Sequence, residues 1–298
     1  MKITIEDLSK KYKNGKLALT DINLEIETGM FGLLGPNGAG KSSLMRILVT
    51  IMKATTGVVQ VNGFDLSKNR GEIRKMLGYL PQDFRFFTKL RTWEFLDYAA
   101  SLSGLKNKKN RLQKVDEWLE KVGLFDARER HANKLSGGMK RRLGIAQALI
   151  GDPKIIVVDE PTTGLDPEER IRFRNILSEL SQKDVIIILS THIVGDISSV
   201  CRDLALLDRG TLQFNGSPEE LVEKARGHVW QVNTSGVEYD LLKEKYAVIS
   251  TIPSEDGWEV QLVGDKLDAK SAIEIEPNLE HAYVYFMEYL SEERMFKL

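Results

Sequence analysis

The chain has 298 residues, of which 42% are hydrophobic and 29% are charged, as in ordinary globular proteins. Its formal net charge of −1 provides no overall field that would attract nucleic acid or an anionic membrane, so we expect no nucleic-acid partner. The single cysteine, Cys201, excludes a disulfide framework, and no apolar run approaches the roughly 18 residues that a membrane-spanning helix needs. Any path across a membrane is therefore expected to come from another chain.

The first half of the chain changes its pattern several times. Residues 1–28 alternate like antiparallel strands, and a glycine-rich turn then leads into a predicted helix at residues 41–52. Short strands are predicted at residues 58–61 and 78–80. Residues 92–150 follow a helical pattern, with apolar residues spaced by about 3.6 positions. This spacing is clearest at Leu112, Val115, Leu119 and Val122.

Two short, fully apolar runs follow, at residues 155–158 and 185–189. Unbroken runs of β-branched residues are typical of parallel strands that are buried on both faces. A predicted helix at residues 168–180 separates them, which makes a βαβ unit and indicates an α/β core.

The character of the chain changes again around residues 221–228. Strands are predicted at residues 229–232, 247–252 and 258–263, with a hairpin turn at Asp256-Gly257 and a closing helix at residues 277–290. We therefore predict a large domain of residues 1–222, whose helical part spans about 88–150, and a small α+β domain of residues 223–298.

One segment has the pattern of a phosphate-binding loop. Its glycines let successive backbone N–H groups point at phosphate oxygens, and the helix that follows adds its positive end. Lys41 is expected to reach the β- and γ-phosphates and Ser42 to hold Mg²⁺. The expected nucleotide contacts are Gly35, Pro36, Asn37, Gly38, Ala39, Gly40, Lys41, Ser42 and Ser43.

Two acids, Asp159 and Glu160, end the first buried run. Ligands of open α/β sheets bind outside the carboxyl ends of the strands. Asp159 is therefore expected to bind Mg²⁺, and Glu160 to orient and deprotonate an attacking water. Taken alone, the pair has an alternative interpretation as two solvated acids at the end of a strand.

A second glycine-rich turn, Ser136-Gly137-Gly138, opens another predicted helix with Ser136 as its N-cap. Lys140, Arg141 and Arg142 follow in the first turn, where cations oppose the helix dipole. A second anion site would explain this placement. The alternative is an ordinary capped helix with a solvated basic face.

Three further residues are weak signals on their own. His192 follows the second buried run, Gln82 follows the short strand at residues 78–80, and Tyr12 offers a ring on which adenine could stack. Each also has a plain structural interpretation, as a core histidine, a loop glutamine and a half-buried surface aromatic.

Together these segments, in this order and spacing, resemble the ABC ATPase family over roughly residues 1–220. Residues 35–42 resemble its Walker A loop, residues 135–139 its signature motif, and residues 155–160 its Walker B strand. The resemblance implies a P-loop NTPase core with an antiparallel β subdomain. It makes Glu160, His192 and Gln82 catalytic, Gln82 a further Mg²⁺ ligand, and Asp166 part of the D-loop.

The resemblance also implies partners and cofactors. The family acts as a head-to-tail dimer in which ATP and Mg²⁺ at Lys41 of one subunit are completed by Ser136 and Gly138 of the other. A homodimer is expected, with a heterodimer as the alternative. The chain resembles the stand-alone subunits of bacterial drug, antibiotic and sodium efflux systems. This implies transmembrane permease partners, export of a drug, antibiotic, peptide or ion, and a place on the cytoplasmic face of a bacterial membrane.

Other members of the family act on DNA or on ribosomes and are the alternative class. The former insert long coiled coils before the signature motif, and the latter carry two cassettes in one chain. This sequence has a short globular interval and one cassette. The sequence also predicts a docking site for the membrane subunit just after Gln82, where Phe86 and Phe87 stand among basic residues.

Overall fold

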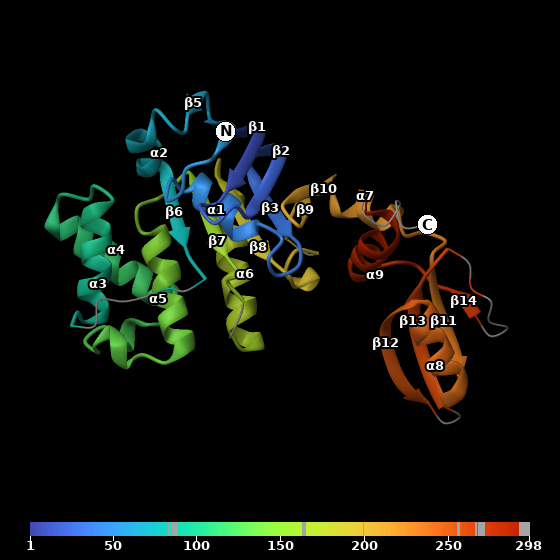
Figure 1. The fold of residues 1–298 in the computed structure, drawn as a ribbon. Helices are drawn as coiled ribbons and strands as arrows, with labels where there is room; N and C mark the ends of the chain where they lie inside the picture. The colour runs from blue at the N-terminus through green and yellow to red at the C-terminus, as the bar shows by residue number, and fades with distance from the viewer. Residues whose placement is uncertain are drawn as a thin grey trace. The chain divides into compact units, whose positions relative to one another are not determined.

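The computed structural model describes residues 1–82, 84, 89–162, 165–198, 200–254, 257–265, 267 and 272–291 (Figure 1). The chain divides into two compact units. One contains Met1–His192 and Val200–Leu212, and the other contains Ile193–Ser199 and Gln213–Leu298. This division falls earlier in the chain than the predicted domain boundary after residue 222, which stays a prediction.

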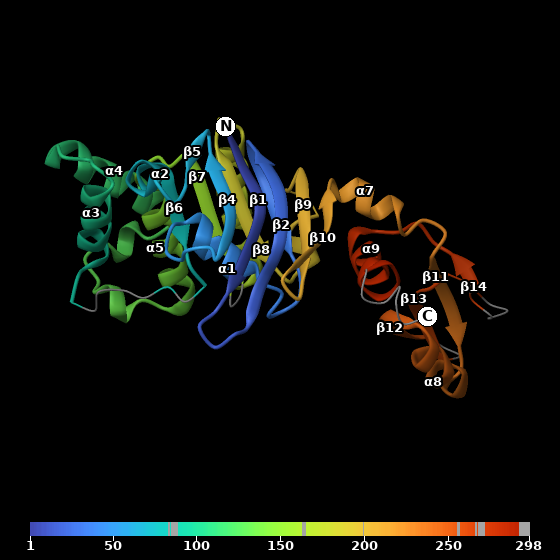
Figure 2. The same ribbon diagram turned by 45° about the horizontal axis from the view of Figure 1, so that its top comes forward.

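The first unit begins with an antiparallel sheet, as the alternation of residues 1–28 predicts. Its strands are β1 (Lys2–Lys11), β2 (Leu17–Glu27), β4 (Thr56–Val61) and β5 (Phe64–Asp65), in the order β2-β1-β4-β5. Figure 2 shows β1, β2 and β4 side by side. Alternate residues such as Ile3, Ile5 and Ile22 are buried, because every second side chain of a strand points to the same face.

A second, six-stranded sheet has the order β10-β9-β3-β8-β7-β6. The strands are β3 (Gly29–Leu34), β6 (Leu77–Leu80), β7 (Ile155–Asp159), β8 (Ile186–Thr191), β9 (Asp203–Asp208) and β10 (Thr211–Gly216). The pairings β6–β7, β7–β8, β8–β3 and β3–β9 are parallel, so these strands end at one edge. All residues of β7 and β8 are buried, which confirms the predicted parallel strands.

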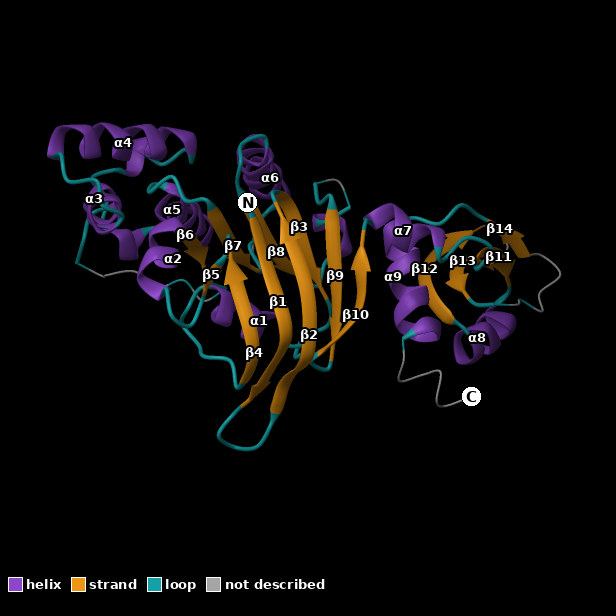
Figure 3. Ribbon diagram, turned by 90° about the horizontal axis from the view of Figure 1, so that it is seen from above, coloured by secondary structure: helices purple, strands orange, loops and turns teal. Residues whose placement is uncertain are grey.

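Helix α1 (Lys41–Leu48) joins the two sheets into one core. Its residues Leu44, Met45 and Ile47 share a buried cluster with the antiparallel sheet and with one face of β7 and β8. Helix α6 (Pro167–Ser181) connects β7 to β8 and covers the opposite face of the parallel sheet (Figure 3). The βαβ unit is therefore confirmed, and so is the predicted fold class.

Helices dominate the region between β6 and β7. The helices there are α3 (Thr92–Leu102), α4 (Lys108–Lys121) and α5 (Gly137–Leu149), and they lie beyond β6 in Figure 3. A further short helix, α2 (Arg70–Met76), comes just before β6. Val115, Leu119 and Val122 are fully buried, as their spacing predicts. Helix α5 brings residues 136–149 against β6 and so links this helical region to the parallel sheet.

The second unit has its own small sheet, ordered β12-β13-β11-β14. Its core contains Val232, Leu242, Val260 and Leu262. The elements are α7 (Pro218–Glu223), β11 (Val229–Thr234), α8 (Gly236–Lys245), β12 (Ala247–Ser254), β13 (Gly257–Val263), β14 (Ala272–Glu274), α9 (Leu279–Tyr285) and a π-helical turn (Phe286–Leu290).

Three strands of the second unit and its closing helix are confirmed, whereas α8 and β14 were not predicted. Asp256, in the predicted hairpin turn, lies outside the described residues. Within the part of the chain that the structure describes, none of the helices has the length and apolar character that crossing a membrane requires.

Candidate functional site

The phosphate loop connects β3 to α1 with a backbone that only glycine adopts without strain. Gly38 has φ 85° and Gly40 has φ 108°, both in the left-handed region. A Cβ atom on Gly40 would lie 2.6 Å from the carbonyl oxygen of Ala18. The loop is therefore held close to β2 and presents its backbone groups at the start of α1.

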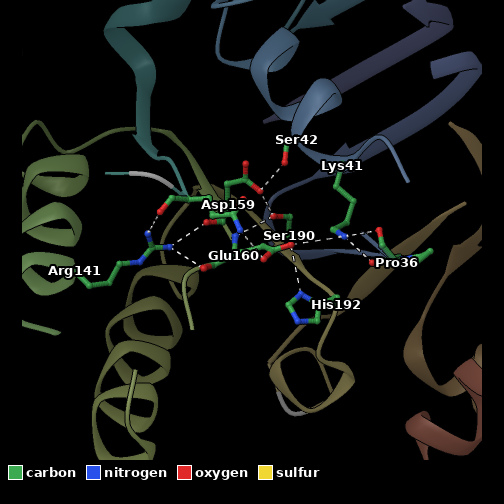
Figure 4. A network of polar contacts seen from close by, with 10 residues as sticks. Pro36, Lys41, Ser42, Arg141, Asp159, Glu160, Ser190 and His192 are labelled. Carbon is green, nitrogen blue, oxygen red and sulfur yellow. Dashed lines mark hydrogen bonds and ion pairs between the residues drawn. The ribbon is translucent and has the colours of Figure 1, made fainter. Parts of the chain in front are cut away.

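Lys41 is the first residue of α1, and only 4% of it is exposed. Its Nζ donates to the carbonyl oxygens of Gly35 at 2.6 Å and Pro36 at 3.0 Å, and lies 3.9 Å from Oε1 of Glu160 (Figure 4). Burial lowers the pKa of Lys41, while the charges of Glu160 and Asp159 oppose that shift. A cation in this setting is suited to contact an anion.

Asp159 ends β7 and is held by two hydroxyl groups. Ser190 Oγ donates to its Oδ1 at 2.6 Å, and Ser42 Oγ lies 3.4 Å from the same oxygen. Ser190 stands opposite Asp159 in the parallel register of β7 and β8, which explains the short contact. Both residues are buried, with exposed fractions of 0% for Ser190 and 2% for Asp159.

Glu160 lies directly after β7, and its carboxylate meets two of the predicted catalytic residues. Gln82 Nε2 donates to Oε2 at 3.1 Å, and His192 Nδ1 lies 3.4 Å from Oε1. The Glu160 N–H donates to Ser190 Oγ at 3.1 Å. Glu160 has φ 45°, a left-handed conformation that is uncommon for a residue with a side chain. Three distant segments, those that follow or end β6, β7 and β8, thus converge on the phosphate loop.

Arg141 also reaches this cluster, although the sequence placed it at a possible second anion site. Its guanidinium donates to backbone carbonyl oxygens near the cluster, among them those of Pro81, Asp159 and Pro161 (Figure 4). It does not point toward the start of its own helix. The interpretation of Arg141 as part of an exposed anion site is therefore wrong. Its helical position was the missed signal, because it lies three and four residues before the buried Gly144 and Ile145.

The signature turn lies at the start of α5. Ser136 is the N-cap, as predicted, and its Oγ accepts a hydrogen bond from the N–H of Met139 at 3.2 Å. Ser136 and Gly137 are exposed. A Cβ atom on Gly138 would lie 2.3 Å from Oε2 of Glu169, whose Oε1 is 3.3 Å from Nε of Arg142. Arg142 is therefore paired within the chain too.

Two further predicted site residues, Tyr12 and Asp166, make contacts within the chain. Tyr12 is hydrogen-bonded through its hydroxyl to Ser43 Oγ at 3.0 Å, and Lys10 Nζ is 5.7 Å from the centre of its ring. Asp166 is the N-cap of α6 and accepts from the N–H of Glu169 at 2.8 Å. Phe86 and Phe87 lie outside the described residues, so that docking hypothesis stays a prediction.

The donor set suits a magnesium ion that is bound partly by a nucleotide. In the described ranges there is no group of three or more His, Cys, Asp or Glu side chains that could hold a metal by itself. Ser42 and Asp159 instead bring one hydroxyl and one carboxylate together. Mg²⁺ usually takes one or two protein oxygens and completes its shell with phosphate oxygens and water, so these residues fit it.

Comparison with known proteins gives consistent matches. The model of a family described as ABC transporter matches residues 19–163. The Uncharacterized ABC transporter ATP-binding protein YxlF of Bacillus subtilis (strain 168) is 33% identical over 262 residues, or 87% of this chain and 86% of that one. The ABC transporter ATP-binding protein NatA of the same organism is 32% identical over 229 residues, or 75% and 93% of the two chains.

A solved structure is similar as well. It is the dimeric, post-hydrolysis state of the ATP-binding cassette MJ0796 bound to ADP and Pi, with a TM-score of 0.67 and 25% sequence identity. The similarity covers 72% of this chain and 98% of that chain.

Proposed function

The chain belongs to the family of ABC transporter ATP-binding proteins, and we propose that it hydrolyses ATP to ADP and phosphate and thereby drives separate transmembrane subunits. The observation that carries this proposal is the meeting of Lys41 and Glu160, 3.9 Å apart, at the carboxyl edge of the parallel sheet. A phosphate-binding cation and a buried carboxylate at that edge are the two groups that phosphoryl transfer to water requires.

Each residue has a role that follows from its position. Lys41 and backbone N–H groups of the non-proline residues in the range 35–43 hold the β- and γ-phosphates at the start of α1. Ser42 and Asp159, with Gln82 as a further ligand, would hold Mg²⁺, which would supply positive charge beside the phosphate oxygens. Glu160 accepts a proton from the water whose oxygen forms the new bond to the γ-phosphorus, as the bond to the bridging oxygen of ADP breaks. Tyr12 stacks on the adenine ring.

Gln82 and His192 each contact a different oxygen of the Glu160 carboxylate, at 3.1 and 3.4 Å. Contacts on both oxygens restrict rotation of the carboxylate, so it faces one direction. We infer that these two residues orient Glu160 toward the attacking water.

The ATP site is shared between two copies of the chain. Ser136 and Gly137 are exposed at the start of α5, whereas Lys41 and Glu160 are buried. A helix start with free N–H groups is suited to contact a phosphate that another chain presents. The dimeric state of the solved cassette bound to ADP and Pi supports a dimer here. We propose a homodimer in which Ser136, Gly137, Gly138 and Asp166 complete the partner's site.

We propose that a short cytoplasmic helix of the membrane subunit docks in a groove on the helical region. Phe84, Phe95 and Tyr98 are among the residues that line it, and Phe84 packs edge-on against Phe95 with ring centres 6.0 Å apart. Leu102, also in the lining, is 72% exposed. An exposed apolar patch of this kind is typical of an interface. Phe84 lies two residues after Gln82 in the chain, which connects the groove to the nucleotide site. The subunit would then lie on the cytoplasmic face of the membrane.

Hydrolysis is tested by two substitutions with different expected results. Glu160→Gln keeps the shape and hydrogen bonds of the side chain but cannot accept a proton, so turnover should fall by about 10²–10⁴ while ATP still binds. Lys41→Ala should weaken ATP binding itself, because it removes the charge that faces the phosphates. Steady-state phosphate release and equilibrium binding of labelled ATP measure the two effects. Wild-type turnover in Glu160→Gln would refute the assignment.

Docking is tested with Leu102→Ser, and Leu17→Ser serves as the matched control because Leu17 is a similarly exposed leucine on β2. Leu102→Ser should reduce recovery of a co-expressed membrane subunit in detergent extracts and leave ATP binding unchanged. Leu17→Ser should change neither. Equal recovery with both variants would place the docking surface elsewhere.

A further inference from the structure

The guanidinium of Arg141 is saturated with backbone carbonyls. Arginine has five N–H donors, and each one of Arg141 has a different carbonyl oxygen as its acceptor. Nε donates to Pro161 at 3.1 Å, Nη1 donates to Pro81 at 2.9 Å and Gln82 at 3.1 Å, and Nη2 donates to Asp159 at 3.0 Å and Glu160 at 2.9 Å. Figure 4 shows the side chain reaching from α5 to the residues after β7.

This arrangement differs from that of most buried arginines, which pair with a carboxylate. Arg141 is only 9% exposed, and its five hydrogen bonds all go to neutral carbonyl groups. Burial lowers the pKa of Arg141 to about 10, while the charges of Asp159 and Glu160 oppose the shift. The guanidinium therefore keeps its proton at neutral pH, and its charge lies just behind the two acids of the site.

The five carbonyls belong to two segments that both end at the ATP site. Pro81 and Gln82 follow β6, whereas Asp159, Glu160 and Pro161 lie at the end of β7 and just after it. Arg141 itself belongs to α5, whose N-cap is the exposed Ser136. One side chain therefore ties three parts of the molecule together: Gln82, Glu160 and the start of the signature helix.

The backbone at Glu160 depends on such support. Its φ of 45° is a left-handed conformation that persists in a non-glycine residue only when its surroundings hold it. The carbonyls before, at and after this residue all accept hydrogen bonds from Arg141. The peptide planes on both sides of Glu160 are therefore fixed, and with them the direction of its carboxylate.

We propose that Arg141 is a positioning residue for ATP hydrolysis, which holds Glu160 and Gln82 in the arrangement where the amide of Gln82 contacts the carboxylate of Glu160. Arg141 acts through these two residues and the start of α5, and it touches no reacting atom. The inference rests on the proposed ATPase function, and the activity of the wild-type chain tests that function separately.

The first test compares Arg141→Lys with Arg111→Lys. Lysine keeps the charge but has three donors, so it cannot span five carbonyls. Arg111 is the matched control, because it donates to the carbonyls of Leu105 and Lys106 and to Asp97 within the helical region. Arg141→Lys should lower kcat by about tenfold or more and change ATP affinity by less than about threefold. Arg111→Lys should leave both unchanged.

The second test asks whether Arg141 acts through Glu160. Residues that act as a unit have non-additive effects, so adding Arg141→Lys to Glu160→Gln should reduce the residual single-turnover rate by less than about twofold. If Arg141 were purely structural, Arg141→Lys would reduce that rate by the same factor as in the wild-type background. It would also lower the melting temperature of the chain to a matching extent.

The outcomes are decisive in each case. A wild-type kcat in Arg141→Lys, a fully additive loss in the double variant, or failure of Arg141→Lys to fold while Arg111→Lys folds would each overturn the proposal. An inactive wild-type chain would instead refute the proposed function.

Discussion

The two motifs that would contact ATP differ sharply in how they are built. Lys41, Asp159 and Glu160 have exposed fractions of 7% or less, and contacts from α1, β8 and the segment after β6 hold them in place. Ser136 and Gly137 are exposed, and the Ser136 hydroxyl only caps its own helix. The contrast teaches that the proposed hydrolytic half of the site is assembled within one chain, whereas the other, outward half is exposed at the start of α5.

The largest effect is expected when two variant chains are mixed, and this experiment tests whether the ATP site is shared between chains. Lys41→Ala removes the hydrolytic half of a chain and Gly138→Asp removes its outward half, so each variant alone should lose nearly all turnover. Mixed dimers should regain one sound composite site. Mixing at equal ratio should restore roughly a quarter of wild-type ATPase activity, because about half of the dimers are mixed and each has one of two sites.

The control for this experiment is a mixture in which both chains carry Lys41→Ala, which should stay inactive. Gly138→Asp is suited to this test because it places a second negative charge beside the carboxylate of Glu169, at the exposed start of α5. Absence of recovery in mixtures whose mixed dimers are verified by mass would mean that each chain completes its own site.

An intermediate effect is expected for Ser190→Ala, which probes the inward half. The Ser190 hydroxyl donates to Asp159 and accepts from the N–H of Glu160. Hydrogen bonds to charged groups contribute about 1.5–3 kcal/mol, so kcat should fall by about 10- to 100-fold. Ser190→Thr keeps the hydroxyl and should retain most activity. A wild-type kcat in Ser190→Ala would show that the strand ends hold Asp159 without this contact.

The smallest effect is expected for Ser136→Ala in the isolated chain. Loss of an N-cap hydroxyl costs about 1 kcal/mol, which chemical denaturation can measure. ATP affinity of the monomer should not change, because in the proposed dimer Ser136 completes the partner's site and not its own. A clear drop in monomer affinity would contradict the division into an inward and an outward half.

Most of the first unit could be predicted from local sequence. The strands β7 and β8 consist of apolar runs that only a doubly buried strand tolerates, and the glycines before Lys41 indicate a turn into a helix. Strand β14 could not be predicted, because it has three residues and exists through its pairing with β11, where Ile273 stands opposite Gln231. Such a long-range pairing leaves no local pattern.

The same distinction separates the predicted site residues from those that were missed. Lys41, Asp159 and Glu160 belong to motifs whose chemistry is visible in a few neighbouring residues. The contact of Ser190 depends on the register in which it stands opposite Asp159. Arg141 has Lys140 and Arg142 as neighbours, so its sequence context indicates an exposed basic face. Its spacing of three and four residues from Gly144 and Ile145 is the weaker signal for an inward position, and the packing of α5 against β6 confirms that position.

The left-handed backbone of Glu160 sets function against stability at a single position. Glycine adopts φ 45° without strain, whereas a residue with a Cβ pays about 1 kcal/mol or more for it. Replacement of Glu160 by glycine would therefore relax the folded chain at the same time as it removed the proposed base. The chain therefore keeps a strained residue at this position. Selection for stability alone would favour glycine there, and only the proposed role of the carboxylate favours glutamate.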